Sequence, residues 1–131
     1  MLYYLKLYLL TFIAFLAIDA VWLGLVAKDF YAKHLGYLMA EQPNLVAALI
    51  FYLIFVVAIL VLVVIPTLEA PLGKTLLMAA LFGFASYATY DLTNLATVKD
   101  WPLLVTIVDL IWGTSIATVT AFIARLIAQR L

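Results

Sequence analysis

Residues 45–65, LVAALIFYLIFVVAILVLVVI, decide the fold because they form a continuous apolar run without a charged side chain. A helix needs about 20 mostly apolar residues to cross the hydrocarbon core of a bilayer. The whole chain of 131 residues is 69% hydrophobic and 11% charged. Soluble domains carry roughly a quarter charged residues. The sequence therefore predicts an integral membrane protein.

Three further apolar runs predict spans at about 4–27, 75–96 and 103–124. Each run is long and lacks the alternation of apolar and polar residues that marks a membrane β-strand, so helices are expected. The predicted fold class is an all-α integral membrane four-helix bundle. It forms a single transmembrane domain over residues 1–131, with a short interfacial segment (29–41) between the first two helices.

Composition excludes several classes of function. Seven basic and seven acidic residues leave no net charge that would attract nucleic acid. The absence of cysteine excludes disulfides and thiolate metal sites. No metal-binding histidine set, nucleophile elbow, phosphate loop or dinucleotide fingerprint is present. We therefore expect no metal and no cofactor, and the sequence identifies no catalytic residue.

Basic residues at the span ends indicate the orientation. We call the face that holds both predicted termini side A, and the opposite face side B. Side A carries Lys6, Lys74, Arg125 and Arg130, and side B carries Lys28, Lys33 and Lys99. The small excess of basic residues on side A favours cytoplasmic termini under the positive-inside rule.

Three aspartates, Asp19, Asp91 and Asp109, lie inside predicted spans. A charge at the bilayer centre costs at least ~3 kcal/mol, so such residues usually mark functional sites. With a helical rise of 1.5 Å per residue, all three fall roughly 5–8 Å from the midplane, in the half nearer side B. Three acids at one depth on three helices predict a single constellation. Hydrogen bonding between helices is the structural alternative.

Helical spacing adds polar and aromatic companions to these aspartates. The candidate ligand-binding residues are Asp19, Asp91, Asp109, Asn94, Tyr87, Tyr90, Trp22 and Trp112. In contrast, the almost purely aliphatic stretch 56–65 predicts a lipid-facing, peripheral second span. Small residues spaced four apart, such as Gly113 and Ala117, favour close helix packing. A chain of only four spans is also expected to form a homodimer if it makes a transport path.

The runs 87–97 (YATYDLTNLAT), 101–102 (WP), 109–113 (DLIWG) and 19–24 (DAVWLG) carry a resemblance to a known family. The sequence resembles small bacterial inner-membrane proteins catalogued as domain of unknown function 2177. The resemblance extends over nearly the whole chain. It implies a bacterial source, four spans and an inner-membrane location. It supplies no activity, substrate or catalytic residue.

Three functions remain open from the sequence. The first is binding or transport, in which the aspartates hold a small polar or cationic ligand, an ion or a proton in a pocket open to side B. The second is a membrane enzyme acting on lipid or isoprenoid substrates, with one aspartate as acid and another as base. The third is a structural subunit whose aspartates dock a partner. The absence of enzyme signatures favours the first, with the lipid bilayer, a small ligand or lipid, and a second copy of the chain as expected partners.

Overall fold

The structure is a computed structural model that describes residues 1–131, and helices are its only regular secondary structure. Four helical segments are long and apolar enough to cross a membrane, namely Leu2–Val26, Leu45–Thr67, Leu72–Thr97 and Leu103–Arg130. The elements in chain order are α1 (Leu2–Val21), η1 (Trp22–Val26), α2 (Lys28–Leu35), α3 (Leu45–Ile59), η2 (Leu60–Val64), η3 (Ile65–Thr67), α4 (Leu72–Thr97) and α5 (Leu103–Arg130). The predicted all-α membrane bundle is confirmed.

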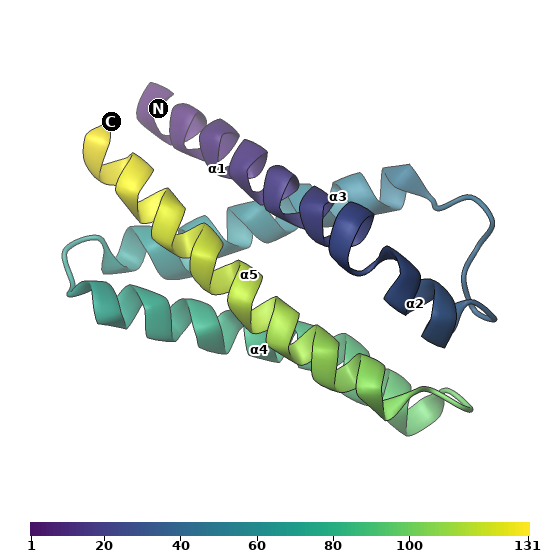
Figure 1. The fold of residues 1–131 in the computed structure, drawn as a ribbon. Helices are drawn as coiled ribbons and strands as arrows, with labels where there is room; N and C mark the ends of the chain where they lie inside the picture. Colours follow the sequence, from purple (N-terminus) through teal and green to yellow (C-terminus); the bar gives the residue numbers. More distant parts are fainter.

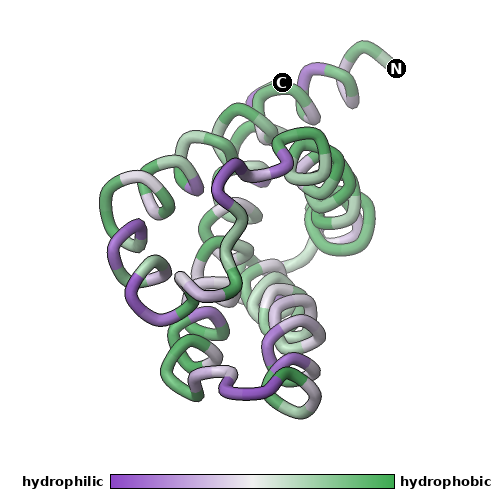
Figure 2. Tube along the Cα trace, turned by 90° about the vertical axis from the view of Figure 1, so that its right-hand side faces the viewer, coloured by the Kyte–Doolittle hydropathy of each residue, from purple (hydrophilic) through white to green (hydrophobic).

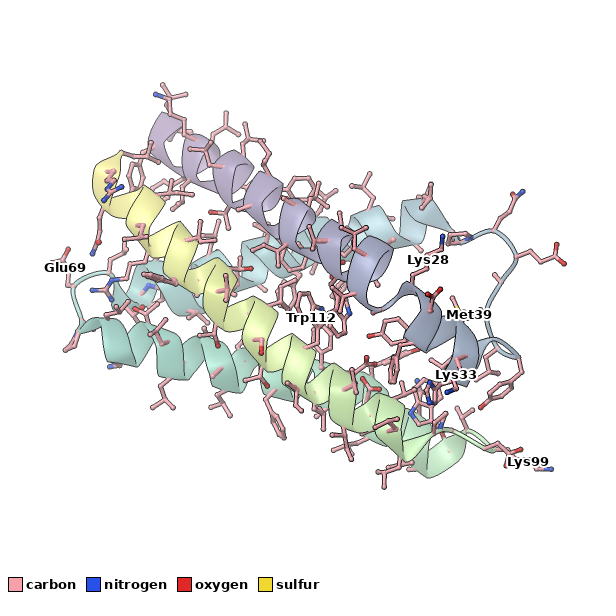
Figure 3. The ribbon with its side chains drawn as sticks, viewed as in Figure 1. Lys28, Lys33, Met39, Glu69, Lys99 and Trp112 are labelled. Atoms are coloured by element: carbon pink, nitrogen blue, oxygen red, sulfur yellow. The ribbon has the colours of Figure 1, made fainter.

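The two ends of the bundle have different characters (Figure 1). Both termini lie at one end, with the loop between η3 and α4, and α2 lies at the other end. Figure 3 labels Lys28, Lys33 and Lys99 at the α2 end and Glu69 at the opposite end. Viewed onto the α2 end, hydrophilic residues gather in the loops and in α2 (Figure 2). These ends correspond to the predicted sides B and A.

Local chemistry explains where the helices begin. The side chain of Asn44 caps α3 by accepting a 3.1 Å hydrogen bond from the backbone N–H of Ala47. Pro71 and Pro102 directly precede α4 and α5. A residue without an N–H removes no helical hydrogen bond at that position. Between α4 and α5, Asp100 has a φ of 60°, a conformation tolerated by aspartate in turns.

The last helix continues to Arg130, beyond the end at residue 124 that hydropathy predicted. Its final turns remain ordered because they have partners in the protein. Ala124 and Ala128 are buried, and the Tyr3 hydroxyl donates a 2.8 Å hydrogen bond to the Ala128 carbonyl. The span predicted from hydropathy ended just before the charged Arg125, but this residue is itself buried against the loop that precedes α4.

Arg125 holds that loop through three hydrogen bonds. Its Nη1 donates to the Thr67 carbonyl at 3.0 Å and to Thr75 Oγ1 at 2.6 Å. Its Nη2 donates to the Ala70 carbonyl at 2.7 Å. The guanidinium group suits this position because it presents several donors in a rigid plane.

Small residues bring α4 and α5 together as an antiparallel pair. Ala79, Gly83, Gly113 and Ala117 are all buried. A methyl group at Gly83 would collide with the Gly113 carbonyl oxygen and with Ala117, and one at Gly113 would collide with the Tyr87 ring. The predicted use of small residues for close packing is confirmed for this pair. Gly24, by contrast, has no neighbour near its missing side chain.

The prediction of a peripheral, lipid-facing second span is wrong. The buried residues of this span include Phe55, Val56, Ile59, Leu60, Val63 and Val64, and they form much of the core. An aliphatic run has no polar face that would identify its buried side, so hydropathy cannot separate a lipid-facing span from a core span. The span therefore contributes one face to the bundle and the other to lipid.

Candidate functional site

A cavity of about 520 Å³ lies next to α2, which contributes Tyr31 and Leu35 to its wall. Residues from α1, η1, α2, α3, α4 and α5 contribute to its wall. Eleven of its 14 lining residues are hydrophobic. The lining consists of Asp19, Trp22, Leu23, Tyr31, Leu35, Met39, Ala48, Phe51, Tyr52, Ser86, Tyr87, Tyr90, Asp109 and Trp112. Its volume is in the range of small-molecule sites, which are about 300–1,000 Å³.

Asp19 lies in the last turn of α1, where its side chain is 6% exposed. The hydroxyl of Tyr52 on α3 donates a 2.5 Å hydrogen bond to its Oδ2. This bond joins the first and second spans at the depth of the cavity. A buried carboxyl group needs such donors because its loss of hydration is otherwise uncompensated.

Asp109 lies on α5 and is held from α2. The hydroxyl of Tyr31 donates a 2.5 Å hydrogen bond to Asp109 Oδ1, and Trp22 Nε1 lies 3.3 Å from the same hydroxyl as a donor. Burial, followed by the hydrogen bond to Asp109, raises the pKa of Tyr31 above its ordinary value. The phenol therefore keeps its proton and remains a donor to Asp109 at neutral pH.

Asp91 is fully buried but does not line the cavity. Neither of its carboxyl oxygens has a hydrogen-bond partner. Across the α4–α5 interface Gly83 faces Ala117 and Tyr87 faces Gly113, so one further turn along each helix brings Asp91 opposite Asp109. Asp91 is thus placed behind Asp109 rather than beside it on the cavity wall.

The tryptophans form a stacked pair on the wall of the cavity. The ring centroids of Trp22 and Trp112 are 4.3 Å apart, with an angle of 8° between the rings. Figure 3 labels Trp112 near the middle of the bundle. Such pairs contribute about 0.5–1.5 kcal/mol beyond their buried area. Tyr31 also meets Trp22 edge to face at 6.5 Å.

The structure brings six of the eight candidate residues to one cavity. These are Asp19, Asp109, Tyr87, Tyr90, Trp22 and Trp112. Asp91 and Asn94 do not line this cavity. Asn94 is half-buried and lies one helical turn beyond Asp91, nearer the α2 end. The constellation predicted from depth is therefore divided into a cavity with two acids and a buried third acid.

Sequence reasoning did not assign Tyr31 and Tyr52 to the site, although both donate to its carboxyl groups. Tyr52 lies at the right depth on the second span, and that was the available signal. Tyr31 and Leu35 are four residues apart, which places them on one face of α2. That face, together with Met39, lines the cavity towards the α2 end.

The cavity is lined by acidic side chains without basic ones. Two carboxyl groups line it, and no lysine, arginine or histidine does. The chain contains no group of three or more histidine, cysteine or acidic residues arranged to hold a metal ion. Buried acids without a basic partner are balanced by a proton or by a bound cation. The cavity wall otherwise offers aromatic faces, whose negative potential attracts cations.

A comparison with family models matches residues 4–126 to the family described as predicted membrane protein, DUF2177. The match includes all of the residues that line the cavity. No curated protein matches the chain, and no solved structure does.

Proposed function

The chain belongs to the DUF2177 family of predicted membrane proteins, and we propose that its cavity binds a small ligand that carries a positive charge. The observation that carries this proposal is the lining itself, in which Asp19 and Asp109 occur without any basic side chain. The function belongs to the binding or transport class. The protein presents no nucleophile or metal arrangement that would favour an enzyme.

The side chains divide into two roles in this proposal. Asp19 and Asp109 supply the negative charge, and each is held in place by a tyrosine hydroxyl. The aromatic side chains of Trp22, Trp112 and Tyr87 supply much of the surrounding surface. A cation near such faces gains about 0.5–2 kcal/mol per favourable ring contact, with the larger values in desolvated sites. An organic ammonium fits this wall better than a metal ion, which would require more oxygen ligands.

A second candidate function, coupling of the ligand to a proton, is favoured by the position of Asp91. Its carboxyl group is buried, lacks a donor and faces Asp109. One proton held between the two groups would supply the missing hydrogen bond. We expect Asp91→Asn to weaken the pH dependence of cation binding while leaving binding itself intact. Equal pH dependence in this variant and wild type would exclude the coupling.

The cellular setting is part of the proposal. The protein spans a membrane, and we place it in the bacterial inner membrane with both termini in the cytoplasm. The end that holds Lys6, Lys74, Arg125 and Arg130 carries one basic residue more than the opposite end, which supports this orientation. The exposed small residues Ala20 and Gly24 on the first span support a homodimer. Surface cysteine labelling in whole cells tests the orientation, and cross-linking in membranes tests the dimer.

The proposal is tested by asking whether the protein distinguishes charge from shape. Choline and its neutral analogue 3,3-dimethylbutan-1-ol have nearly the same shape, but only choline is charged. A ligand that binds only the folded state stabilises it by RT ln(1 + L/Kd), where L is the free ligand concentration, so the melting temperature rises as this concentration exceeds the dissociation constant. We expect choline to raise the melting temperature of the purified protein in maltoside micelles, and the neutral analogue to leave it unchanged. Equal shifts with the two compounds would contradict the proposal. So would the absence of any shift at ligand concentrations up to about 100 times the dissociation constant of a weak site.

A further inference from the structure

A second cavity, of about 430 Å³, lies against the outer side of the first span. Its wall is entirely apolar and consists of Ala17, Ile18, Val21, Trp22, Val26 and Trp112. Ala17, Val21 and Val26 are exposed on the surface of the helix bundle. We call this cavity the lipid-side groove, because exposed apolar residues of a membrane span face the hydrocarbon of the bilayer.

The lipid-side groove and the acidic cavity share a wall. Trp22 and Trp112 line both of them, and they are the stacked pair described above. On one side of this pair are two carboxyl groups and several tyrosines, and on the other side is a surface with no polar side chain. A molecule that occupied both spaces would be polar and cationic at one end and apolar at the other.

Trp22 also connects this wall to the acid site. Its Nε1 donates to the Tyr31 hydroxyl, which in turn donates to Asp109. Trp22 is the first residue of η1, where the backbone is a π-helix. Such turns occur frequently at functional sites, because they place a side chain where a regular helix would not. The position of the shared wall is therefore set by the same contacts that hold Asp109.

We infer that the ligand is an amphipathic ammonium compound, with its cationic head in the acidic cavity and its alkyl chain passing the Trp22–Trp112 pair into the lipid-side groove. This inference rests on the proposed function and specifies its ligand class. Charge complementarity with Asp19 and Asp109 places the head in the acidic cavity, and the apolar groove on the other side of the Trp22–Trp112 pair accommodates the chain. The ligand would enter from the bilayer rather than from water.

The test compares two probes that share a head and differ in their chain. Tetramethylammonium tests the head site alone, and octyltrimethylammonium adds an alkyl chain. Binding of both to the purified full-length protein in maltoside micelles is measured by calorimetry. The groove is filled by Ala17→Phe and, in a second protein, by Val21→Phe. Ile13→Phe is the control, since Ile13 is exposed on the same helix and lines neither cavity.

We expect octyltrimethylammonium to bind wild type and Ile13→Phe at least tenfold more tightly than tetramethylammonium does. Both groove-filling variants should lose most of this gain and keep the wild-type affinity for tetramethylammonium. If the groove only holds a lipid acyl chain, the gain will be the same in every variant, which overturns the inference and leaves the proposed function standing. Loss of tetramethylammonium binding in both folded groove variants would also overturn it, because the groove would then be part of the head site and not a separate site for the chain. If neither probe binds wild type, the proposed function fails as well.

Discussion

Tyr31 and Asp109 are joined by a 2.5 Å hydrogen bond although they are 78 residues apart in the chain. The bond links the short helix α2 to the last membrane span. It closes the acidic cavity at one end and orients one of its two carboxyl groups. Since α2 buries no residue completely, this polar contact is a main attachment of α2 to the bundle.

Tyr31→Phe should loosen α2 without unfolding the spans. The change removes the donor to Asp109 and the acceptor of Trp22 Nε1, while keeping the aromatic ring. A hydrogen bond to a charged group contributes about 1.5–3 kcal/mol. We expect faster amide hydrogen exchange over α2 in detergent, with little change in the four spans. Tyr4→Phe is the control because Tyr4 is exposed in α1. Unchanged exchange over α2 would refute the attachment.

Asp91→Asn should not lower the melting temperature. Asp91 receives no hydrogen bond, so no donor is stranded when its charge is removed. An asparagine amide can instead donate to the facing Asp109. Asp109→Leu should lower the melting temperature, because it leaves the half-buried Tyr31 hydroxyl without its acceptor, at about 1–3 kcal/mol. Thermal unfolding of the two variants in the same detergent checks the contrast. Equal losses would show that Asp91 has a structural partner.

Gly113→Ala should destabilise the bundle, whereas Gly24→Ala should not. The added methyl would collide with the Tyr87 ring at Gly113, but would meet nothing within 4 Å at Gly24. Overpacking of this kind typically costs about 1–3 kcal/mol. Thermal unfolding should therefore give a lower midpoint only for Gly113→Ala. A midpoint equal to that of wild type would mean that α4 and α5 are less tightly packed than described.

Arg125→Lys should destabilise the end of the bundle that holds the termini. A lysine cannot reproduce the planar set of donors to Thr67, Thr75 and Ala70. Since hydrogen bonds from charged groups contribute about 1.5–3 kcal/mol each, loss of one or two should lower the melting temperature measurably. Arg130→Lys is the control, because Arg130 is exposed. Equal melting of the two variants would contradict this role.

Much of the site could be predicted from the depth of charged residues. Asp19 and Asp109 were expected at one level of the membrane, and the structure places both on the wall of one cavity. Depth follows from counting residues along a helix, so it depends little on how the helices cross. Asp91 was expected beside them, but the close approach of α5 at Gly113 covers this part of α4. Helical spacing gives the face of a residue and not the neighbour that covers it.

The remaining features required the three-dimensional arrangement. The second span is uniformly aliphatic, so its sequence could not show that Ile59 and Val63 are buried while Val61 faces outward. The return of α2 over the cavity depends on the contact of Tyr31 with a residue on a distant helix. The pairing of Trp22 with Trp112 likewise joins opposite ends of the chain. Their equal depth was visible in the sequence, but their stacking was not.

The most direct measurement for the central claim is the affinity for tetramethylammonium after the cavity charge is removed. Asp19→Asn and Asp109→Asn keep the side-chain shape and an oxygen that accepts from Tyr52 or Tyr31. Asp29→Asn is the control, since Asp29 is exposed on α2 and lies outside the cavity lining. Calorimetry in maltoside micelles should show a loss of about tenfold or more, or about 1.4 kcal/mol, in each cavity variant and none in the control. Wild-type affinity in both folded cavity variants would contradict the assignment of this cavity as a cation site.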